Sequence, residues 1–206
     1  EAEEGRSAGA LDTPWKIWNT LHAWLCLPLV RTKFLLNGIR WAKGGKYFGV
    51  PVIQKHRRSE MSLGDGIGLR SSLRSNPLGP NHPVFLTTWQ KGAVLKIGRD
   101  FAMTGGTLCA AGRIEIGDHV TIGANVMVVD SDFHPLDPER RLTHPNDGQT
   151  APVIIEDNVF IGTNSLILKG ARIGRGSVIG AGSVVTGNIP AGVIAAGNPA
   201  RVLRPL

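Results

Sequence analysis

A single histidine, His134, lies among carboxylates in the stretch VVDSDFHPLDPERR at residues 128–141. Imidazole is the side chain whose ordinary pKa suits removal of a proton near neutral pH, so this histidine is a candidate general base. A base works better when a partner fixes its tautomer, and Asp132, two residues earlier, is the partner that we expect. The remaining charged residues leave a second interpretation open, in which the acids hold the loop through its arginines. These residues are Asp130, Asp137, Glu139, Arg140 and Arg141.

The sequence that surrounds this stretch has a period of six residues. From residue 153 onward, aliphatic residues recur at every sixth position, and small or β-branched residues recur two positions earlier. A helix would show spacings of three and four, and a lone strand a spacing of two, so neither explains the pattern. A six-residue period is typical of a parallel β-helix with three short strands in each coil. The aliphatic column is Ile155, Ile161, Ile167, Ile173, Ile179 and Val185, and the smaller column is Val153, Val159, Ser165, Ala171, Ser177 and Ser183.

The same period runs upstream of the histidine, with one skipped residue. Its positions there are Ile97, Met103, Cys109, Ile116, Ile122 and Val128. The step from Val128 to Ile155 is 27 residues where six would suffice. The chain must therefore leave the coil, and we place an inserted loop at residues 129–152. Because packed coils have few side chains to spare, this loop is expected to form the functional face of an all-β solenoid that spans residues 59–206.

Three blocks of the sequence resemble the hexapeptide-repeat acyltransferases. They are VTIGANVMVVDSDFHPLDPERR, PVIIEDNVFIGTNSLILKGARIGRGSVIGAGSVVTGNIP and AAGNPARV. The resemblance covers about residues 60–206 and is strongest for the maltose and galactoside O-acetyltransferases and related enzymes that decorate bacterial surface polysaccharides. It implies a left-handed β-helix, a homotrimer with active sites between subunits, and acetyl-CoA as donor, with no metal required. His134 matches the histidine of the HP…R motif of this family, which implies that it is catalytic.

The resemblance also implies a coenzyme site along the C-terminal coils. The matching positions are Gly162, Thr163, Ala181 and Thr186 for the pantetheine arm, and Arg201 and Arg204 for the nucleotide. The small residues have an alternative role in packing at corners, and the arginines in a solvated tail. Gly187 stands where the family commonly has lysine, so Lys169 or Arg175 is the cation that would have to compensate.

The donor for a developing oxyanion is a second departure from the family. The sugar acetyltransferases carry an asparagine in the coil before the catalytic loop, whereas this chain reads FAMTGGTLCAAG at residues 101–112 and is one residue shorter. Exposed amides at Gly105 or Gly106 are the substitutes to test, although glycine is also typical of β-helix corners. His82, in the irregular stretch SNPLGPNHP, is a candidate for the acceptor site.

Residues 1–58 form a separate basic segment that is rich in tryptophan. Thr13 followed by Pro14 predicts the start of a helix, and Pro28 is expected to break or kink it. Residues 13–58 carry nine Lys or Arg and no acid, and the apolar run at 23–30 is too short to span a bilayer. Tryptophan with interleaved cations is typical of a helix that lies in a membrane surface, so we expect peripheral membrane contact through residues 13–46. A cap on the open end of the solenoid is the alternative.

The composition limits which classes of partner the protein can be expected to bind and in which cellular compartment it is expected. The net charge of +7 comes from residues 13–58, since the rest of the chain, including residues 1–12, carries 7 − 9 = −2, and no nucleic-acid-binding motif is present. Two cysteines 83 residues apart predict no disulfide framework. With no secretory pattern, we expect a cytoplasmic protein, on the inner face of the membrane if the basic segment binds there.

The sequence therefore favours an acetyl-CoA-dependent O-acetyltransferase. Its acceptor would be a sugar hydroxyl of a bacterial polysaccharide or of its precursor, with direct transfer and His134 as general base. Three alternatives remain: N-acetylation of an amino sugar, a non-catalytic trimeric scaffold at the membrane, and a zinc enzyme of the carbonic-anhydrase type. The zinc enzyme would need two histidines five residues apart, and no pair in the sequence has that spacing.

Overall fold

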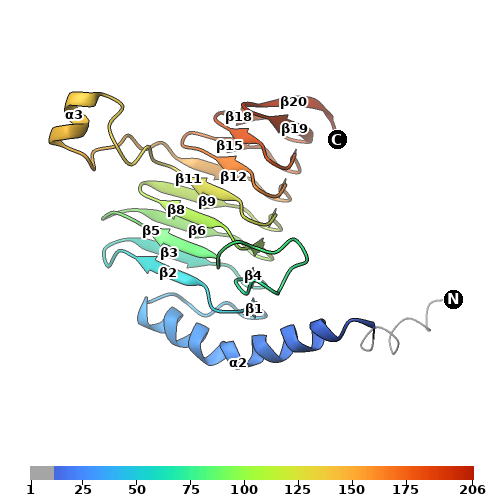
Figure 1. The fold of residues 1–206 in the computed structure, drawn as a ribbon. Coiled ribbons are helices and arrows are strands. Elements are labelled where there is room, and N and C mark those ends of the chain that lie inside the picture. The colour runs from blue at the N-terminus through green and yellow to red at the C-terminus, as the bar shows by residue number, and fades with distance from the viewer. Residues whose placement is uncertain (1–11) are drawn as a thin grey trace.

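The computed structural model describes residues 12–206, which form a left-handed parallel β-helix with a helix across its first coil (Figure 1). Three sheets make the sides of a prism, and each coil passes through them in turn. All strand pairs are parallel except β19–β20, which is antiparallel. The period of six thus predicted the fold class.

The elements have the following bounds. The first sheet holds β1 (Lys46–Phe48), β4 (Gly68–Arg70), β7 (Ala102–Thr104), β10 (Thr121–Ile122), β13 (Phe160–Ile161), β16 (Val178–Ile179), β19 (Val193–Gly197) and β20 (Ala200–Pro205). The second holds β2 (Val52–Lys55), β5 (Phe85–Thr88), β8 (Thr107–Ala110), β11 (Met127–Val129), β14 (Leu166–Ile167) and β17 (Val184–Val185). The third holds β3 (Glu60–Leu63), β6 (Val94–Ile97), β9 (Arg113–Ile116), β12 (Val153–Ile155), β15 (Arg172–Ile173) and β18 (Asn188–Ile189). The helices are α2 (Pro14–Leu36) and α3 (Pro138–Thr143).

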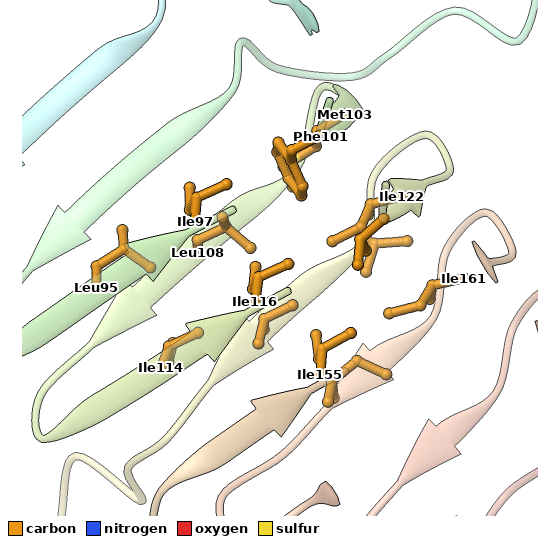
Figure 2. Packing of buried hydrophobic residues seen from close by; sticks show 14 of the residues in the cluster. Leu95, Ile97, Phe101, Met103, Leu108, Ile114, Ile116, Ile122, Ile155 and Ile161 are labelled. Carbon is orange, nitrogen blue, oxygen red and sulfur yellow. The ribbon is translucent and has the colours of Figure 1, made fainter. Parts of the chain in front are cut away.

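The core is a set of stacked aliphatic columns inside the prism (Figure 2). In the third sheet, Ile155 lies between Ile116 and Ile173 in adjacent coils, and all three are buried. The smaller column is buried as well, and its serines direct their hydroxyls to backbone carbonyls. Ser165 Oγ, for example, donates to the carbonyl of Gly162 at 2.9 Å. Hydroxyl donation satisfies polar groups inside the stack, which is why serine is tolerated there.

The upstream register differs from the predicted one at a single coil. Leu108, and not Cys109, occupies the inward column, because it pairs with Val128 and Leu86 in the adjacent coils. The corner at Gly105–Gly106 is one residue short, with five residues from Met103 to Leu108, and the next step, from Leu108 to Ile116, has eight residues in place of six. Both glycines have positive φ, which lets the chain turn in less space. Cys109 is nevertheless buried, and burial raises its thiol pKa to about 11.

The N-terminal region enters the solenoid earlier than predicted. β1 and β2 pair with β4 and β5, so the sheets begin at residue 46, ahead of the boundary expected at residue 59. The helix starts at Pro14 as predicted, but Pro28 does not end it. Pro28 is exposed, while Val30 and Phe34 in the following turns are buried against the first coil, so packing holds the helix together beyond the proline. No helix within residues 12–206 has the length and apolarity that a bilayer crossing needs.

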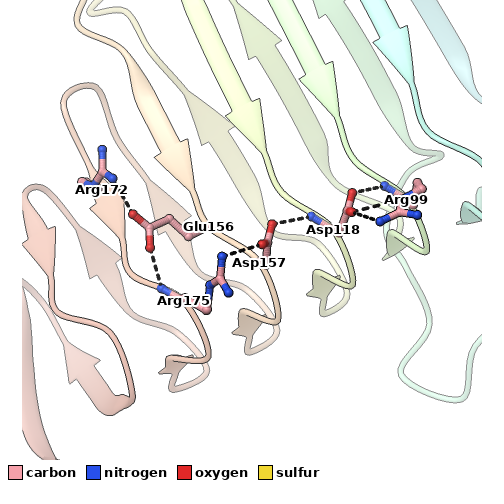
Figure 3. A network of polar contacts seen from close by, with 6 residues as sticks. All are labelled: Arg99, Asp118, Glu156, Asp157, Arg172 and Arg175. Atoms are coloured by element: carbon pink, nitrogen blue, oxygen red, sulfur yellow. Dashed lines mark hydrogen bonds and ion pairs between the residues drawn. The ribbon is translucent and has the colours of Figure 1, made fainter.

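Polar side chains link successive coils along the edge between the third and first sheets (Figure 3). Asp118 Oδ1 accepts from the backbone N–H of Arg99 at 2.7 Å, and Asp157 Oδ1 accepts from that of Asp118 at 2.9 Å. The Arg99 guanidinium also donates to Asp118 Oδ2, which lowers the pKa of that carboxyl below its ordinary value. Each carboxylate thus accepts a hydrogen bond from a backbone N–H of the preceding coil. That N–H lies in a turn and has no partner in a neighbouring strand.

The Asp118 carboxylate makes stability depend on pH. A carboxyl whose native pKa is lowered binds fewer protons when folded than when unfolded, so its contribution is present above about pH 4 and is lost as pH falls further. Asp118→Asn should lower the melting temperature at pH 7 and flatten its fall between pH 5 and pH 3. Thermal melts followed by circular dichroism would measure this, with Glu139→Gln on the exposed helix α3 as control. Equal slopes for Asp118→Asn and the parent protein would contradict the prediction.

Candidate active site

The inserted loop leaves the solenoid between β11 and β12, at the edge between the second and third sheets. Its two ends run antiparallel: the N–H of Asp132 donates to the Gln149 carbonyl at 3.0 Å, and that of Ala151 donates to the Asp130 carbonyl at 3.0 Å. A bridge between Ser131 and Thr150 lies between these bonds. The ends form a short two-stranded base for residues 130–152, close to the bounds predicted for the loop.

Asp130 fixes this base to the preceding coil. Its carboxylate is fully buried and accepts from three successive backbone N–H groups, those of Ala111 and Gly112 at 2.7 Å and that of Arg113. Three such bonds can compensate for the cost of burying a charged group. Asp130 therefore holds the loop in place, but through backbone N–H groups of the preceding coil and not through the loop arginines, which were the partners expected in the second interpretation.

Asp132 connects the loop to the following coil. Its Oδ2 lies 2.8 Å from Lys169 Nζ, and both side chains are largely buried. The N–H of Gly170 beside this lysine donates to the Ala151 carbonyl at 3.1 Å. The loop is thus held from above and below, by the coils that contain β8 and β14. The pairing also engages Lys169, the cation considered for the coenzyme.

His134 is exposed at the end of this base. Its Nδ1 lies 2.5 Å from the carbonyl oxygen of Pro145, on the returning side of the loop. A carbonyl only accepts hydrogen bonds, so this contact requires the proton on Nδ1, and in the neutral ring that tautomer leaves Nε2 with a free lone pair. The partner that orients the ring here is the Pro145 carbonyl. Asp132 contacts His134 through its backbone carbonyl, which accepts from the His134 N–H at 2.7 Å.

A close approach of two backbones sets the position of His134. Phe133 has φ 61°, a conformation that bulky residues rarely adopt, and its N–H donates to Ser131 Oγ at 2.9 Å. Gly148 packs against this turn so tightly that a Cβ there would lie 2.5 Å from the Phe133 carbonyl carbon and 2.7 Å from the His134 nitrogen. Gly148 and Pro145 were not singled out in the sequence, because only the folded loop brings them against the histidine.

The outer part of the loop is organised by its other charged residues. Asp137 caps α3 by accepting from the Arg140 N–H at 2.7 Å, and the Arg140 side chain forms an ion pair with Asp147. Arg141 donates to the Pro135 carbonyl at 3.3 Å. These contacts fold the loop on itself.

The positions expected to bind the coenzyme fall on two edges of the prism. Gly162, Thr163 and Ala181 lie between the first and second sheets, whereas Thr186 lies between the second and third, the edge that carries His134. Gly162 has a packing role, since a Cβ there would lie 2.4 Å from the Ala181 nitrogen. The Thr163 hydroxyl donates to the Ala124 carbonyl at 2.7 Å. One chain therefore does not place Gly162, Thr163 and Ala181 on the same edge as the histidine.

The remaining candidates differ in how available they are. Arg201 and Arg204 are exposed on β20, and each guanidinium donates only to a neighbouring backbone carbonyl among the contacts of residues 12–206. Arg175 is paired with Asp157 at 3.0 Å on the edge between the third and first sheets. That edge is distinct from those that carry the other candidates.

The glycines proposed as oxyanion donors are not presented to solvent. Gly105 and Gly106 are buried, and the Gly105 N–H already donates to the Arg70 carbonyl at 2.8 Å. The SNPLGPNHP loop packs over them, so that a Cβ on Gly105 would lie 2.6 Å from Pro80 Cβ. The expectation of exposed amides was wrong, because this loop covers the corner. His82, in the same loop, is half-buried, and its ring is nearly perpendicular to that of Phe85, with the ring centroids 5.5 Å apart.

The part of the chain that the structure describes holds no group of three or more His, Cys, Asp or Glu residues placed to bind a metal.

Comparison with known proteins supports the repeat and the fold. Residues 152–187 match the family profile described as "Hexapeptide repeat of succinyl-transferase". A 2,3,4,5-tetrahydropyridine-2,6-dicarboxylate N-acetyltransferase of Staphylococcus aureus is 46% identical over 54 residues, which cover 26% of this chain and 23% of that protein. The chain thus matches about a quarter of the length of this curated relative.

Two solved structures resemble the chain more broadly. A mutant of AntD, an N-acyltransferase from Bacillus cereus in complex with dTDP and coenzyme A, superimposes with a TM-score of 0.60 at 19% identity, over 81% of this chain and 82% of that one. A maltose O-acetyltransferase from Clostridium difficile 630 is 25% identical over 96% and 90% of the two chains, with a TM-score of 0.46. The AntD superposition establishes a shared fold, and the second superposition is too loose to add to it.

The role of Asp130 can be tested directly. Asp130→Asn would turn an amide NH₂ towards backbone N–H donors and leave at least one of them unpaired, so we expect a loss of about 1–3 kcal/mol of unfolding free energy. Asp137→Asn is the matched control, because asparagine caps helices about as well as aspartate and this site is exposed. Urea unfolding would measure both. A loss no larger for Asp130→Asn than for Asp137→Asn would contradict the assignment.

Proposed function

We propose that this protein is an acetyl-CoA-dependent acetyltransferase in which His134 is the general base. The observation that carries the proposal is the contact between His134 Nδ1 and the Pro145 carbonyl at 2.5 Å. It selects the tautomer in which the exposed Nε2 can accept a proton. The resemblance of the loop to the HP…R motif and the match of residues 152–187 to a hexapeptide repeat support the same reaction.

His134 would act on the acceptor. Acetyl-CoA, when bound, supplies the acetyl group as a thioester. His134 Nε2 accepts the proton of the acceptor hydroxyl while that oxygen attacks, so a bond from oxygen to the acyl carbon forms and the carbon–sulfur bond breaks. The imidazolium that results can return the proton to the leaving thiolate. The fixed Nδ1–H bond keeps the ring in place throughout, and no nucleophilic serine or cysteine is needed.

The site that we propose lies between subunits of a homotrimer. The His134 loop and the Gly162–Ala181 corner occupy different edges of one prism, so a second chain would bring a loop to a neighbour's corner. Large apolar side chains on the outer surfaces of the sheets support lateral packing of copies. They are Met127, Phe160 and Leu166, and Met127 pairs with Leu166 in adjacent strands of the second sheet.

The donor site in this proposal includes exposed Arg201 and Arg204 for the phosphates of the nucleotide, with Thr163, Ala181 and Thr186 along the pantetheine arm. Guanidinium groups suit phosphates because they donate several hydrogen bonds in a fixed plane. Gly162 would contribute by bringing the two corners close together.

The acceptor that we propose is a sugar hydroxyl of a bacterial polysaccharide or of its precursor, on the cytoplasmic side of the membrane. An amine of an amino sugar is the second candidate. The names of AntD and of the Staphylococcus aureus relative, both N-acyl or N-acetyl transferases, favour this candidate. Neutral His134 can serve either acceptor, because both lose a proton during transfer.

His134→Ala should lower kcat by about 10²–10⁴-fold, the range expected when a general base is removed. His144→Ala is the matched control, since this histidine lies in the same loop, is exposed, and contacts its neighbour Thr143. Release of free thiol from acetyl-CoA, measured with matched hydroxyl and amino sugars, would test the base and the acceptor together. A parent protein without turnover on any acceptor, or an unchanged rate for His134→Ala, would contradict the proposal.

Gly148→Ala should displace the turn at Phe133 and His134 and lower kcat by about 10²-fold, because small misplacements of a reacting group are costly. The KM for acetyl-CoA should change little, since this glycine lies outside the proposed donor site. Gly68→Ala is the control: its added Cβ would meet Ala102 Cβ at an ordinary 3.9 Å. If both variants keep parental turnover, the close packing at Gly148 does not position the base.

A further inference from the structure

The helix α2 lies across the end of the prism beside the first coil (Figure 1). It attaches through a narrow stripe of buried side chains, Cys26, Val30 and Phe34, which recur every four residues on one face. Phe34 packs against Tyr47 and Trp41, with ring centroids 5.6 Å apart in both pairs. This stripe closes the solenoid, and the cap predicted as one alternative is therefore present.

The opposite face of α2 is also apolar, which a cap does not require. At about 3.6 residues per turn, the side chains on that face point away from Val30 and from the prism. They include Trp18, Leu21, Leu25, Leu29 and Leu36, and all of them are at least half exposed. Thr32 is the polar residue on this face. A helix that is apolar on both sides is normally covered on both sides, so the outer face needs an occupant.

The charges around this face indicate which occupant it fits. Residues 13–58 contain nine Lys or Arg and no acid. A groove of about 430 Å³ runs between α2 and the loop after β4, and Lys16, Arg70 and Arg74 line it beside Trp15. Asp65, which lies at the same end of the molecule, is already paired with Arg40 at 3.0 Å. The apolar face is thus bordered by cations that an anionic surface would complement.

We propose that α2 is an in-plane membrane helix, and that this end of the prism docks on a bilayer that contains anionic lipid. A second copy of the chain is the less suitable occupant, because it would bring two basic surfaces of the same sequence together, and such like-charge contacts are costly. Exposed tryptophans support the bilayer, since Trp15, Trp18 and Trp24 are suited to the boundary between headgroups and acyl chains.

Binding of α2 to a bilayer is a function separate from acyl transfer, and it does not depend on the proposed reaction. The inserted loop leaves the prism several coils away from α2, so a bilayer against the end of the prism would leave the His134 loop in water (Figure 1). In this proposal the lipid is a surface to which the protein binds, and it takes no part in the reaction.

Flotation of the full-length protein with vesicles tests the proposal. Phosphatidylcholine vesicles with 30% phosphatidylglycerol, about a third of the lipid, would be compared with pure phosphatidylcholine vesicles at low and high salt. The parent protein should float with the anionic vesicles, less at high salt, and its tryptophan emission should shift to the blue. Leu25→Glu/Leu29→Glu, at two positions that are 76% and 60% exposed, should lower the bound fraction at least tenfold. Lys16→Ala should lower the affinity about fivefold.

Leu203→Glu is the matched control, because this leucine is 65% exposed and lies on β20, at the opposite end of the prism from α2, and it should float like the parent protein. Circular dichroism melts and gel filtration would verify that each variant is folded. The proposal is overturned if the parent protein stays with the unbound fraction. It is also overturned if Leu25→Glu/Leu29→Glu floats as the parent protein does. A third contradicting result is that the parent protein is an oligomer without affinity for vesicles and that the double substitution only dissociates this oligomer.

Discussion

The stacking of aliphatic side chains inside the prism is the constraint on which the rest of the molecule depends. Each inward position is in contact with its equivalents one coil earlier and one coil later, as Ile155 is with Ile116 and Ile173. If one coil gained or lost a single residue and no later turn compensated for it, the following strands would point their polar side chains into the prism. The strands are therefore uniform, and variation is confined to the edges, where the chain turns and the column is not interrupted.

The inserted loop shows how a functional group is placed under that constraint. The loop leaves and rejoins the solenoid at one edge, and the coils on either side hold its base through Asp130 and through the Asp132–Lys169 pair. Rigidity comes from the stack and reaches His134 through a two-stranded base and the tight turn at Phe133. The loop is long, but the part that carries the histidine is held by the paired ends of the base and by the close packing of Gly148. The tautomer is thus set by a backbone group, the Pro145 carbonyl, whereas the position of the histidine also depends on the side chains that anchor the base.

Much of this could be predicted from the sequence, and the reasons for the exceptions are specific. The period gave the fold class, the columns and the place of the loop, because a solenoid repeats one local rule. Cys109 was placed one residue off the column, since the step from Met103 to Leu108 is one residue short and the next step, to Ile116, is two residues long, so that the sequence shows only one extra residue in total. The role of Asp130 was left open, because its three donors belong to the preceding coil. Pro145 and Gly148 carry no signal of their own, and their contact with the His134 turn exists only in the folded loop.

The two ends of the stack have a consequence for assembly. At the C-terminal end, β20 reverses direction and pairs antiparallel with β19, and at the N-terminal end α2 covers the first coil. A parallel β-helix with open ends would present unpaired strands to the next molecule, as the edge strands of a sheet do. Because one end closes with a reversed strand and the other with a helix, two molecules have no matching ends to join. This difference between the two ends disfavours the growth of fibres along the axis of the solenoid.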